Sequence, residues 1–395
     1  MSPLGATVVL SAFDVLQFPQ GGGHFSAFLQ YVDGLRANGC EVWWLERLSA
    51  SGDPQADART ARELSARLDA AGLPGRLIVY AGDSDDQRTW LTFPAAEAEA
   101  VLARAELLLN FFYELDAEML ARFRCTALVD IDPGLLQLWM ATAALDVSAH
   151  DLYFTTGATV GTPQAMFPSC GVEWIHIRPP VSVELWPFVP DAPERGFTTV
   201  SSWWSDEWAL DGSGSEWYPN SKRISFLEYV ELPRLVGFPL ELSLSVDDSE
   251  GEDVAMLEQH GWLVRRAEEV TSTPAAYRAY VQGSAGEFSC AKPSCMRLQN
   301  AWVSDRTICY LASGRPAVVQ NTGPSPYLDV GRGLLRFSTP EEAAEALSQV
   351  QGSYAAHCAA ARELAEAHFD ARKVTAEILE AALGAGDPAA RSAAG

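Results

Sequence analysis

Short, almost continuously apolar runs alternate with stretches of helical spacing along the first half of the chain. Strands that are buried on both faces of a parallel sheet carry such runs, because neither face meets water. Between the first two runs, apolar residues recur at helical spacing from Phe25 to Leu35, and Gly39 stands where a C-terminal cap belongs. Strands are therefore expected at 7–13, 41–45, 76–80, 107–112, 126–131, 152–155 and 173–177.

Five prolines interrupt this alternation between residues 178 and 195, which suits a crossing between domains. The alternation then resumes, and Thr339-Pro340 with Glu342 predicts a well-capped helix start. A long final helix is expected over 355–383, followed by a frayed tail. Further strands are expected at 198–202, 240–246, 262–266, 287–290, 317–320 and 334–337.

Repeated strand, helix and strand units predict an α/β protein with two Rossmann-like, doubly wound parallel-sheet domains facing across a cleft. The expected divisions are 1–190, 191–365, and a closing helix with its tail at 366–395. In such sheets the loops after the strands line the crevice between the domains. Candidate chemistry is therefore sought in those loops.

Charge and cysteine content restrict the expected partners and location. The chain carries 52 acidic and 28 basic residues, a formal charge of −24, and such a field repels phosphate backbones and anionic lipid. We expect no nucleic acid partner and no integral membrane association. The 7 cysteines form no CxxC pair, so reduced thiols in a cytoplasmic protein are expected. The start of the chain lacks a signal-peptide pattern.

A glycine-rich loop follows the first expected strand. Gly21, Gly22 and Gly23 directly precede His24, and glycine amides at a helix start can approach an acceptor or a phosphate closely. His24 is a candidate general base. A flexible turn with a solvent-facing histidine is the alternative. The dinucleotide fingerprint GxGxxG is absent here.

A second candidate opens the helix expected at 304–313. Ser304 can cap this helix, Asp305 suits the positive end of its dipole, and Arg306 offers a planar fork for a diphosphate. Thr307 lies in the same first turn. An ordinary capped helix with a solvated Asp305 and Arg306 is the alternative.

Polar residues after neighbouring strands could complete a donor site. Lys292 follows the strand that precedes this helix, although a surface lysine would look the same. The remaining donor candidates, each also explained by a plain turn or by core packing, are Asn321, Thr322 and Gly323 after one strand and Ser202 and Trp203 after another.

Asp130 and Asp132 follow an N-terminal strand, so either carboxylate could bind acceptor hydroxyls. Asp132 is the alternative base to His24. It could equally well just open a turn. Metal-ligand spacing is absent, so no metal is expected.

Residues 304–323 (SDRTICYLASGRPAVVQNTG) resemble the donor-binding segment of glycosyltransferases of the GT-B fold. In that segment a helix ends in an Ala-x-Gly-x-Pro turn, here 312–316, before a buried strand. Residues 333–343 and 365–370 are similar to the strand, helix and closing region that follow. The resemblance implies a nucleotide-sugar donor on the second domain, an acceptor on the first, and no need for metal. Two glutamates of many retaining members are replaced here by Ala301 and Cys309.

The expected function is transfer of a sugar from a nucleoside-diphosphate sugar to a hydroxyl of a small-molecule acceptor, with inversion. His24 would act as base, and Lys292, Arg306 and helix amides would stabilise the leaving diphosphate. No cofactor is expected beyond this co-substrate. A nucleotide-sugar epimerase and a catalytically degenerate sugar-nucleotide-binding protein remain alternatives, and a Rossmann oxidoreductase lacks its glycine fingerprint.

Overall fold

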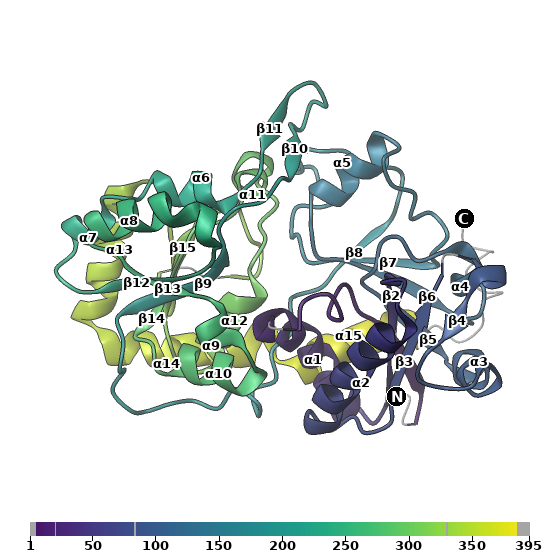
Figure 1. Ribbon diagram of the computed structural model, residues 1–395. Helices are drawn as coiled ribbons and strands as arrows, with labels where there is room; N and C mark the ends of the chain where they lie inside the picture. The colour runs from purple at the N-terminus through teal and green to yellow at the C-terminus, as the bar shows by residue number, and fades with distance from the viewer. Residues whose placement is uncertain (1–4, 20, 83, 329–330, 385–395) are drawn as a thin grey trace.

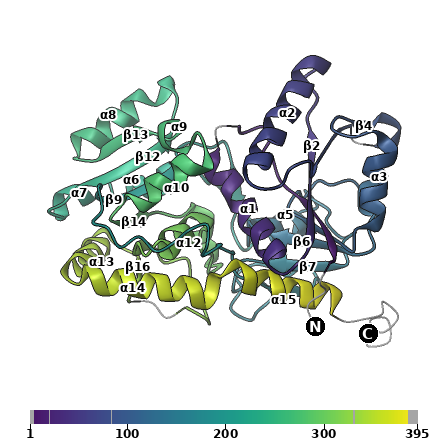
Figure 2. The same cartoon turned by 90° about the horizontal axis from the view of Figure 1, so that it is seen from below.

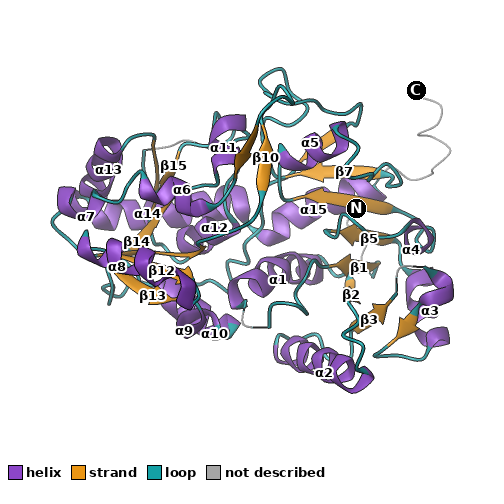
Figure 3. Ribbon diagram, turned by 45° about the horizontal axis from the view of Figure 1, so that its top comes forward, coloured by secondary structure: helices purple, strands orange, loops and turns teal. Residues whose placement is uncertain are grey.

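Two parallel sheets, each flanked by helices, form two bodies joined by crossing segments (Figures 1 and 3). The computed structural model describes residues 5–19, 21–82, 84–328 and 331–384. Gln20 and the tail beyond residue 384, for which fraying was expected, lie outside the described residues.

The first sheet has eight strands in the order β4-β3-β2-β1-β5-β6-β7-β8, all parallel except the short edge strand β4. Its strands are β1 (Thr7–Ser11), β2 (Glu41–Leu48), β3 (Leu77–Ala81), β4 (Thr89–Trp90), β5 (Leu107–Asn110), β6 (Thr126–Asp130), β7 (Leu152–Thr155) and β8 (Trp174–His176). The associated helices are α1 (Gly22–Ala37), α2 (Pro54–Ala70), α3 (Ala95–Arg104), α4 (Ala117–Leu120) and α5 (Leu135–Ala141), with a 3₁₀ turn at Asp85–Gln87.

The second sheet has six parallel strands in the order β13-β12-β9-β14-β15-β16. They are β9 (Phe197–Ser202), β12 (Leu240–Ser245), β13 (Leu263–Arg266), β14 (Gly286–Ser289), β15 (Ala317–Gln320) and β16 (Leu334–Phe337). The helices of this part are α6 (Lys222–Leu227), α7 (Leu232–Leu235), α8 (Gly251–Gln259) after a 3₁₀ turn at Asp248–Glu250, α9 (Glu268–Thr271), α10 (Pro274–Gln282), α11 (Pro293–Leu298), α12 (Asp305–Ala312), α13 (Pro340–Gly352) and α14 (Tyr354–Leu364).

An antiparallel hairpin of β10 (Trp208–Leu210) and β11 (Trp217–Pro219) interrupts the second unit between β9 and α6. The sequence pattern did not predict it, because each strand is only three residues long and rich in aromatic and acidic residues. The hairpin stands between the two bodies, beside α5 (Figure 1).

The single helix expected over 355–383 is wrong, because the chain leaves helical geometry at Asp370. There α14 passes through a π-helical turn (Ala365–Phe369), and α15 (Ala371–Leu383) begins with the Asp370 side chain as its cap. Val181 of the proline-rich crossing pairs with this break, since its amide donates to the Phe369 carbonyl at 2.7 Å and its carbonyl accepts from Ala371 N at 2.9 Å. Both crossings between the bodies therefore run side by side.

The last helix returns to the first body and packs against α1, as the fold prediction expected (Figure 2). Gly34 makes this approach possible, because a Cβ there would lie 2.4 Å from the Ala371 carbonyl oxygen. The side-chain amide nitrogen of Asn38 donates to the Arg372 carbonyl at 2.8 Å. The helix start expected at Thr339 is confirmed, since Thr339 Oγ1 accepts from Glu342 N at 3.2 Å.

Candidate active site

The main candidate site is a cleft of about 670 Å³ between the two sheets. It lies at the carboxyl ends of β1, β9, β12 and β13, where ligands of doubly wound sheets bind. The loop after β1 supplies one wall and the second sheet the other. The lining residues that concern the site are Phe18, Gly21, Gly23 and His24 on the first wall, and Ser202, Lys222, Trp302, Ser304, Asp305 and Arg306 on the second.

The glycine-rich loop brings the two bodies close together. Gly21 precedes α1 as its cap residue, and its amide donates to the Phe18 carbonyl. A Cβ on Gly22 would lie 2.3 Å from the carbonyl oxygen of Thr271 at the end of α9. A Cβ on Gly23 would lie 3.4 Å from the Tyr277 ring, which is an ordinary contact distance. Gly22 is therefore the glycine that close contact between the bodies requires.

His24 is half-buried in the first wall. Its Nε2 lies 2.6 Å from the Phe13 carbonyl oxygen, and a carbonyl only accepts, so Nε2 carries the hydrogen. The Phe13, Phe18 and Phe28 rings surround the imidazole edge-on. Nδ1 is then the nitrogen with a free lone pair, and it has no hydrogen bond within the described part of the chain. This arrangement suits a base.

The start of α12 has the predicted cap. Ser304 Oγ accepts from Arg306 N at 3.2 Å, Asp305 is exposed in the first turn, and Thr307 is buried. The amino end of this helix faces the cleft, and its first amides lie at the positive end of the helix dipole.

The fork of Arg306 is not free to hold a diphosphate, which corrects the expectation for this residue. Its Nε donates to Glu287 Oε1 at 2.6 Å, one Nη to the Val200 carbonyl at 2.7 Å, and the other to Ser289 Oγ. The side chain is buried and joins α12 to β9 and β14. Its role is to anchor the helix, although its charge still acts on the cleft.

Lys222, at the start of α6, is the cation that the sequence reasoning missed. Because the hairpin is inserted between them, Lys222 lies twenty residues after the end of β9. In the sequence, only the position of Lys222 at a helix start could have indicated its role. Among the described residues it has neither an ion pair nor a hydrogen bond. Burial, and then the neighbouring charges of Arg306 and Lys292, lower the pKa of the Lys222 ammonium group to about 7. A cation crowded by other cations is suited to bind an anion.

Lys292 lies further along, where the two bodies meet. Its Nζ donates to Glu207 Oε2 at 2.6 Å. Burial raises the pKa of Asp132, while the charge of Lys292 lowers it, so the two charges act on each other across the region where the bodies meet. Asp132 also opens the turn before α5, the alternative expected for it, and its carboxylate accepts from Tyr113 Oη at 3.3 Å. Asp130 is fully buried and bonded to Gln137 and Thr155.

Trp203 does not present an indole face to a ligand, which corrects the stacking role expected for it. Its side chain is 0% exposed, and Nε1 donates to Asp253 Oδ2 at 2.8 Å. Ser202 is exposed and lines the cleft. Trp302, which the sequence reasoning did not single out, is half-exposed at the cleft wall.

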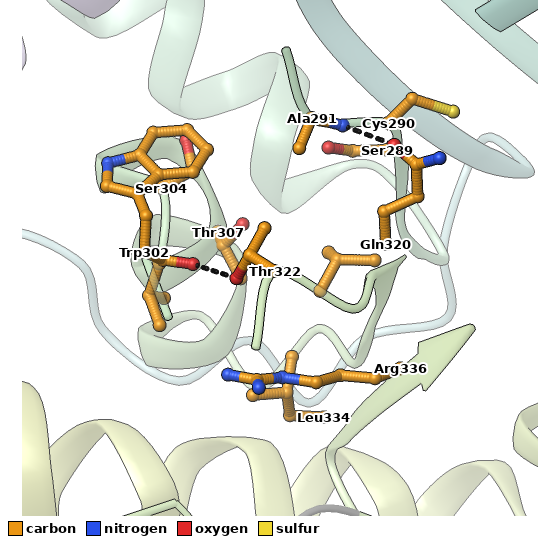
Figure 4. A pocket seen from close by; sticks show the side chains of 12 residues that line it. Ser289, Cys290, Ala291, Trp302, Ser304, Thr307, Gln320, Thr322, Leu334 and Arg336 are labelled. Atoms are coloured by element: carbon orange, nitrogen blue, oxygen red, sulfur yellow. Dashed lines mark hydrogen bonds between the residues drawn. The ribbon is translucent and has the colours of Figure 1, made fainter. Parts of the chain in front are cut away.

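The turn after β15 supports the loop that carries Trp302. Thr322 Oγ1 donates to the Trp302 carbonyl at 2.7 Å (Figure 4). Asn321 Oδ1 accepts from Gly323 N, and a Cβ on Gly323 would lie 2.6 Å from the Gln299 carbonyl oxygen. Asn321, Thr322 and Gly323 therefore stabilise the loop that forms this wall of the cleft, and they do not line the cleft themselves.

A smaller cavity lies behind this wall, among Trp302, Thr307, Gln320 and Arg336 (Figure 4). Its volume of about 20 Å³ leaves room for roughly one water. A nucleotide requires the larger cleft.

Other classes of site are not found in the part of the chain that the structure describes. No three His, Cys, Asp or Glu side chains there are grouped to hold a metal ion. No helix there is long and apolar enough to cross a membrane. No disulfide joins the seven cysteines, which all lie in the described ranges.

The sequence matches no family model, and no curated protein matches it. Solved structures do resemble it. An alpha-glucosyltransferase in complex with UDP-glucose and DNA containing an abasic site is 10% identical, with a TM-score of 0.60 over 96% of this chain and 99% of the other. The pneumococcal O-GlcNAc transferase GtfA in complex with UDP and GlcNAc is 9% identical, with a TM-score of 0.52 over 95% and 97%. The Candida albicans trehalose-6-phosphate phosphatase N-terminal domain is 8% identical, with a TM-score of 0.53 over 96% and 97%.

These similarities correct the expected partners. An architecture shared over 96% of this chain is found in complex with DNA in the alpha-glucosyltransferase. The expectations of no nucleic acid partner and of a small-molecule acceptor are therefore wrong, because net charge describes the average field and not the surface that a ligand meets. The similarities confirm the architecture predicted from residues 304–323. The chain has the GT-B fold.

Proposed function

We propose that this protein is a glycosyltransferase that takes a sugar from a nucleoside-diphosphate donor bound in the cleft. The observation that carries the proposal is that Lys222 lines the cleft beside the amino end of α12 and has no partner in the described part of the chain. A lysine ammonium group and free helix amides are suited to bind a diphosphate. The complexes of the similar folds with UDP and UDP-glucose give further support.

The donor diphosphate is placed between Lys222 and the first turn of α12. Ser202 and Asp305 line the same wall, and their side chains can bond to sugar or ribose hydroxyls. Lys222 and the amides of α12 would stabilise the charge that develops on the leaving diphosphate. Departure of the diphosphate then needs no metal ion, and turnover is expected to persist in the presence of a chelator.

His24 is the proposed base. Its Nδ1 would accept the proton of the acceptor hydroxyl as that oxygen attacks the anomeric carbon. A single displacement of this kind inverts the anomeric configuration. NMR of the product tests this point, because a retained anomeric configuration would remove His24 from the proposed step.

The proposed roles of the three parts of the chain follow from the positions of His24 and Lys222. Residues 1–190 would hold the acceptor, residues 191–365 the donor, and residues 366–395 would tie the two together. The position of His24 on the first wall and of Lys222 on the second supports this assignment.

One assay distinguishes the proposed glycosyltransferase from a nucleotide-sugar epimerase and from a catalytically degenerate binding protein. The protein is incubated with UDP-glucose and UDP-N-acetylglucosamine, and both released UDP and the sugar of the remaining donor are measured. A glycosyltransferase releases UDP, by slow hydrolysis where no acceptor is present, and leaves the unreacted donor unchanged. An epimerase changes the donor sugar without releasing UDP. A degenerate binding protein does neither, and that outcome would overturn the proposal if the protein still binds UDP.

A further inference from the structure

Three tryptophans are exposed within one short segment of the chain. The exposed fraction is 57% for Trp204, 55% for Trp208 and 57% for Trp217. All three lie on or next to the β10–β11 hairpin, which stands between the two bodies (Figure 1). Tryptophan is usually well buried, so three exposed indoles close together mark a surface that binds something.

The register of the hairpin places two of these indoles on the same face. Trp208 pairs with Pro219 and Leu210 pairs with Trp217, whereas Ala209 and Tyr218 pair on the opposite face. Side chains alternate across strands, so Trp208 and Trp217 are diagonal neighbours, within reach of one extended ligand.

The other face fixes the hairpin in place. Ala209 and Tyr218 pack against Leu135 of α5, and the Arg297 guanidinium lies 4.0 Å from the centre of the Tyr218 ring. The turn is closed by Asp211, which accepts hydrogen bonds from the amides of Ser215 and Glu216. The indoles are therefore presented by a preorganised support, and a ligand would lose little affinity to ordering it.

The charge of the segment restricts its ligand. Residues 203–219 contain four carboxylates and no lysine or arginine. Platforms that stack single-stranded nucleic acid combine aromatic rings with a positively charged groove, and this segment supplies no positive charge. Indole faces next to carboxylates suit pyranose rings, whose C–H faces stack on aromatic planes while their hydroxyls donate to carboxylate oxygens. Asp206 and Glu216 are exposed and can serve as such acceptors.

The hairpin adjoins the region where the two bodies meet. Glu207, the residue before β10, bonds to Lys292, and its charge acts on Asp132 of the first body. A chain bound along the hairpin would therefore lie where the two bodies meet (Figure 1).

We infer that the β10–β11 hairpin, an insertion in the second body, is a docking surface for the distal part of an uncharged glycan chain whose acceptor hydroxyl is held by the first body. Trp208 and Trp217 stack on its sugar rings, and Asp206 and Glu216 accept from its hydroxyls. This inference rests on the proposed function and names the acceptor class for the same site.

Calorimetric titration of the full-length protein with maltohexaose and cellohexaose tests the inference, with a 12-mer of deoxythymidine as the charged probe. The W208A/W217A double variant is compared with W208F/W217F and with L263A, which removes an exposed apolar side chain from β13. At least one hexasaccharide should bind. The double alanine variant should lose tenfold or more in affinity, the phenylalanine variant should keep part of it, and L263A should match the wild type.

Absence of saccharide binding would overturn the inference, as would equal binding by the double alanine variant, or binding of the oligonucleotide that depends on these two indoles. UDP affinity is measured in parallel. The hairpin variants should bind UDP as the wild type does, so failure of the docking surface is distinguishable from failure of the donor site.

Discussion

The imidazole of His24 and the backbone carbonyl of Phe13 are joined by a hydrogen bond of 2.6 Å. The bond links the first turn of α1 to the start of the loop that leaves β1, and it fixes which ring nitrogen carries the hydrogen. A backbone acceptor thus leaves the lone pair of Nδ1, the proposed base, without a hydrogen bond among the described residues.

Replacing His24 by glutamine keeps a donor for the Phe13 carbonyl but removes the base. We expect kcat for sugar transfer to fall by about 100-fold or more, with the affinity for UDP unchanged, because the donor is held by the opposite wall. Turnover assays and calorimetry measure the two effects. The control is H260Q, at the end of α8, which should retain activity. Wild-type turnover by H24Q would rule out the proposed role.

The charge state of Lys222 should make donor affinity depend on pH. Its pKa of about 7 in the free protein means that the side chain loses its proton as the pH rises from 7 to 9. Binding a diphosphate then requires proton uptake, so UDP affinity should fall by up to about tenfold per pH unit. Arginine stays charged over this range, so K222R should show a flat profile. Parallel slopes for the two proteins would contradict this assignment.

The buried pair of Arg306 and Glu287 should be important for stability. R306M leaves the Glu287 carboxylate, which is 0% exposed, without its partner, and we expect a loss of about 3–5 kcal/mol in the free energy of unfolding. R306M/E287L removes both charges and should recover much of that loss. Urea unfolding measures the free energy of unfolding of each variant. If R306M alone were as stable as the wild type, Arg306 would be free to bind ligand after all.

Gly22 should tolerate no side chain, because a Cβ would meet the Thr271 carbonyl at 2.3 Å. G22A is expected to cost about 1–3 kcal/mol of stability and to lower kcat/KM, since the walls of the cleft would be pushed apart. G237A is the matched control, because nothing lies within 4 Å of its Cβ position. Thermal unfolding and steady-state kinetics of the two variants give the comparison, and equal behaviour would show that the contact is dispensable.

Most of the fold could be predicted from the sequence, because its strands are buried on both faces and read as apolar runs. The strands at Leu152–Thr155, Ala317–Gln320 and Leu334–Phe337 have the predicted bounds. The break at Asp370 was not predictable, since it depends on pairing with Val181, about 190 residues away. The hairpin is too short to give a pattern of its own.

The site was only partly predictable, because sequence shows where a residue lies along the chain but not which way its side chain points. His24, Ser304 and Asp305 do line the cleft. Arg306 looked like a phosphate ligand, yet its guanidinium turns inward to Glu287. Lys222 was missed because the hairpin separates it from the strand whose loop it joins.

Calorimetric titration of UDP into the wild type, K222M and K373M tests the central claim most directly. Lys373 lies on α15 and serves as the matched loss of a lysine. We expect one UDP to bind per chain in the wild type and in K373M, and roughly tenfold to a hundredfold weaker binding in K222M. If UDP, GDP, dTDP and ADP all failed to bind the wild type, or if K222M bound UDP as tightly as the wild type, a diphosphate site at Lys222 would be contradicted.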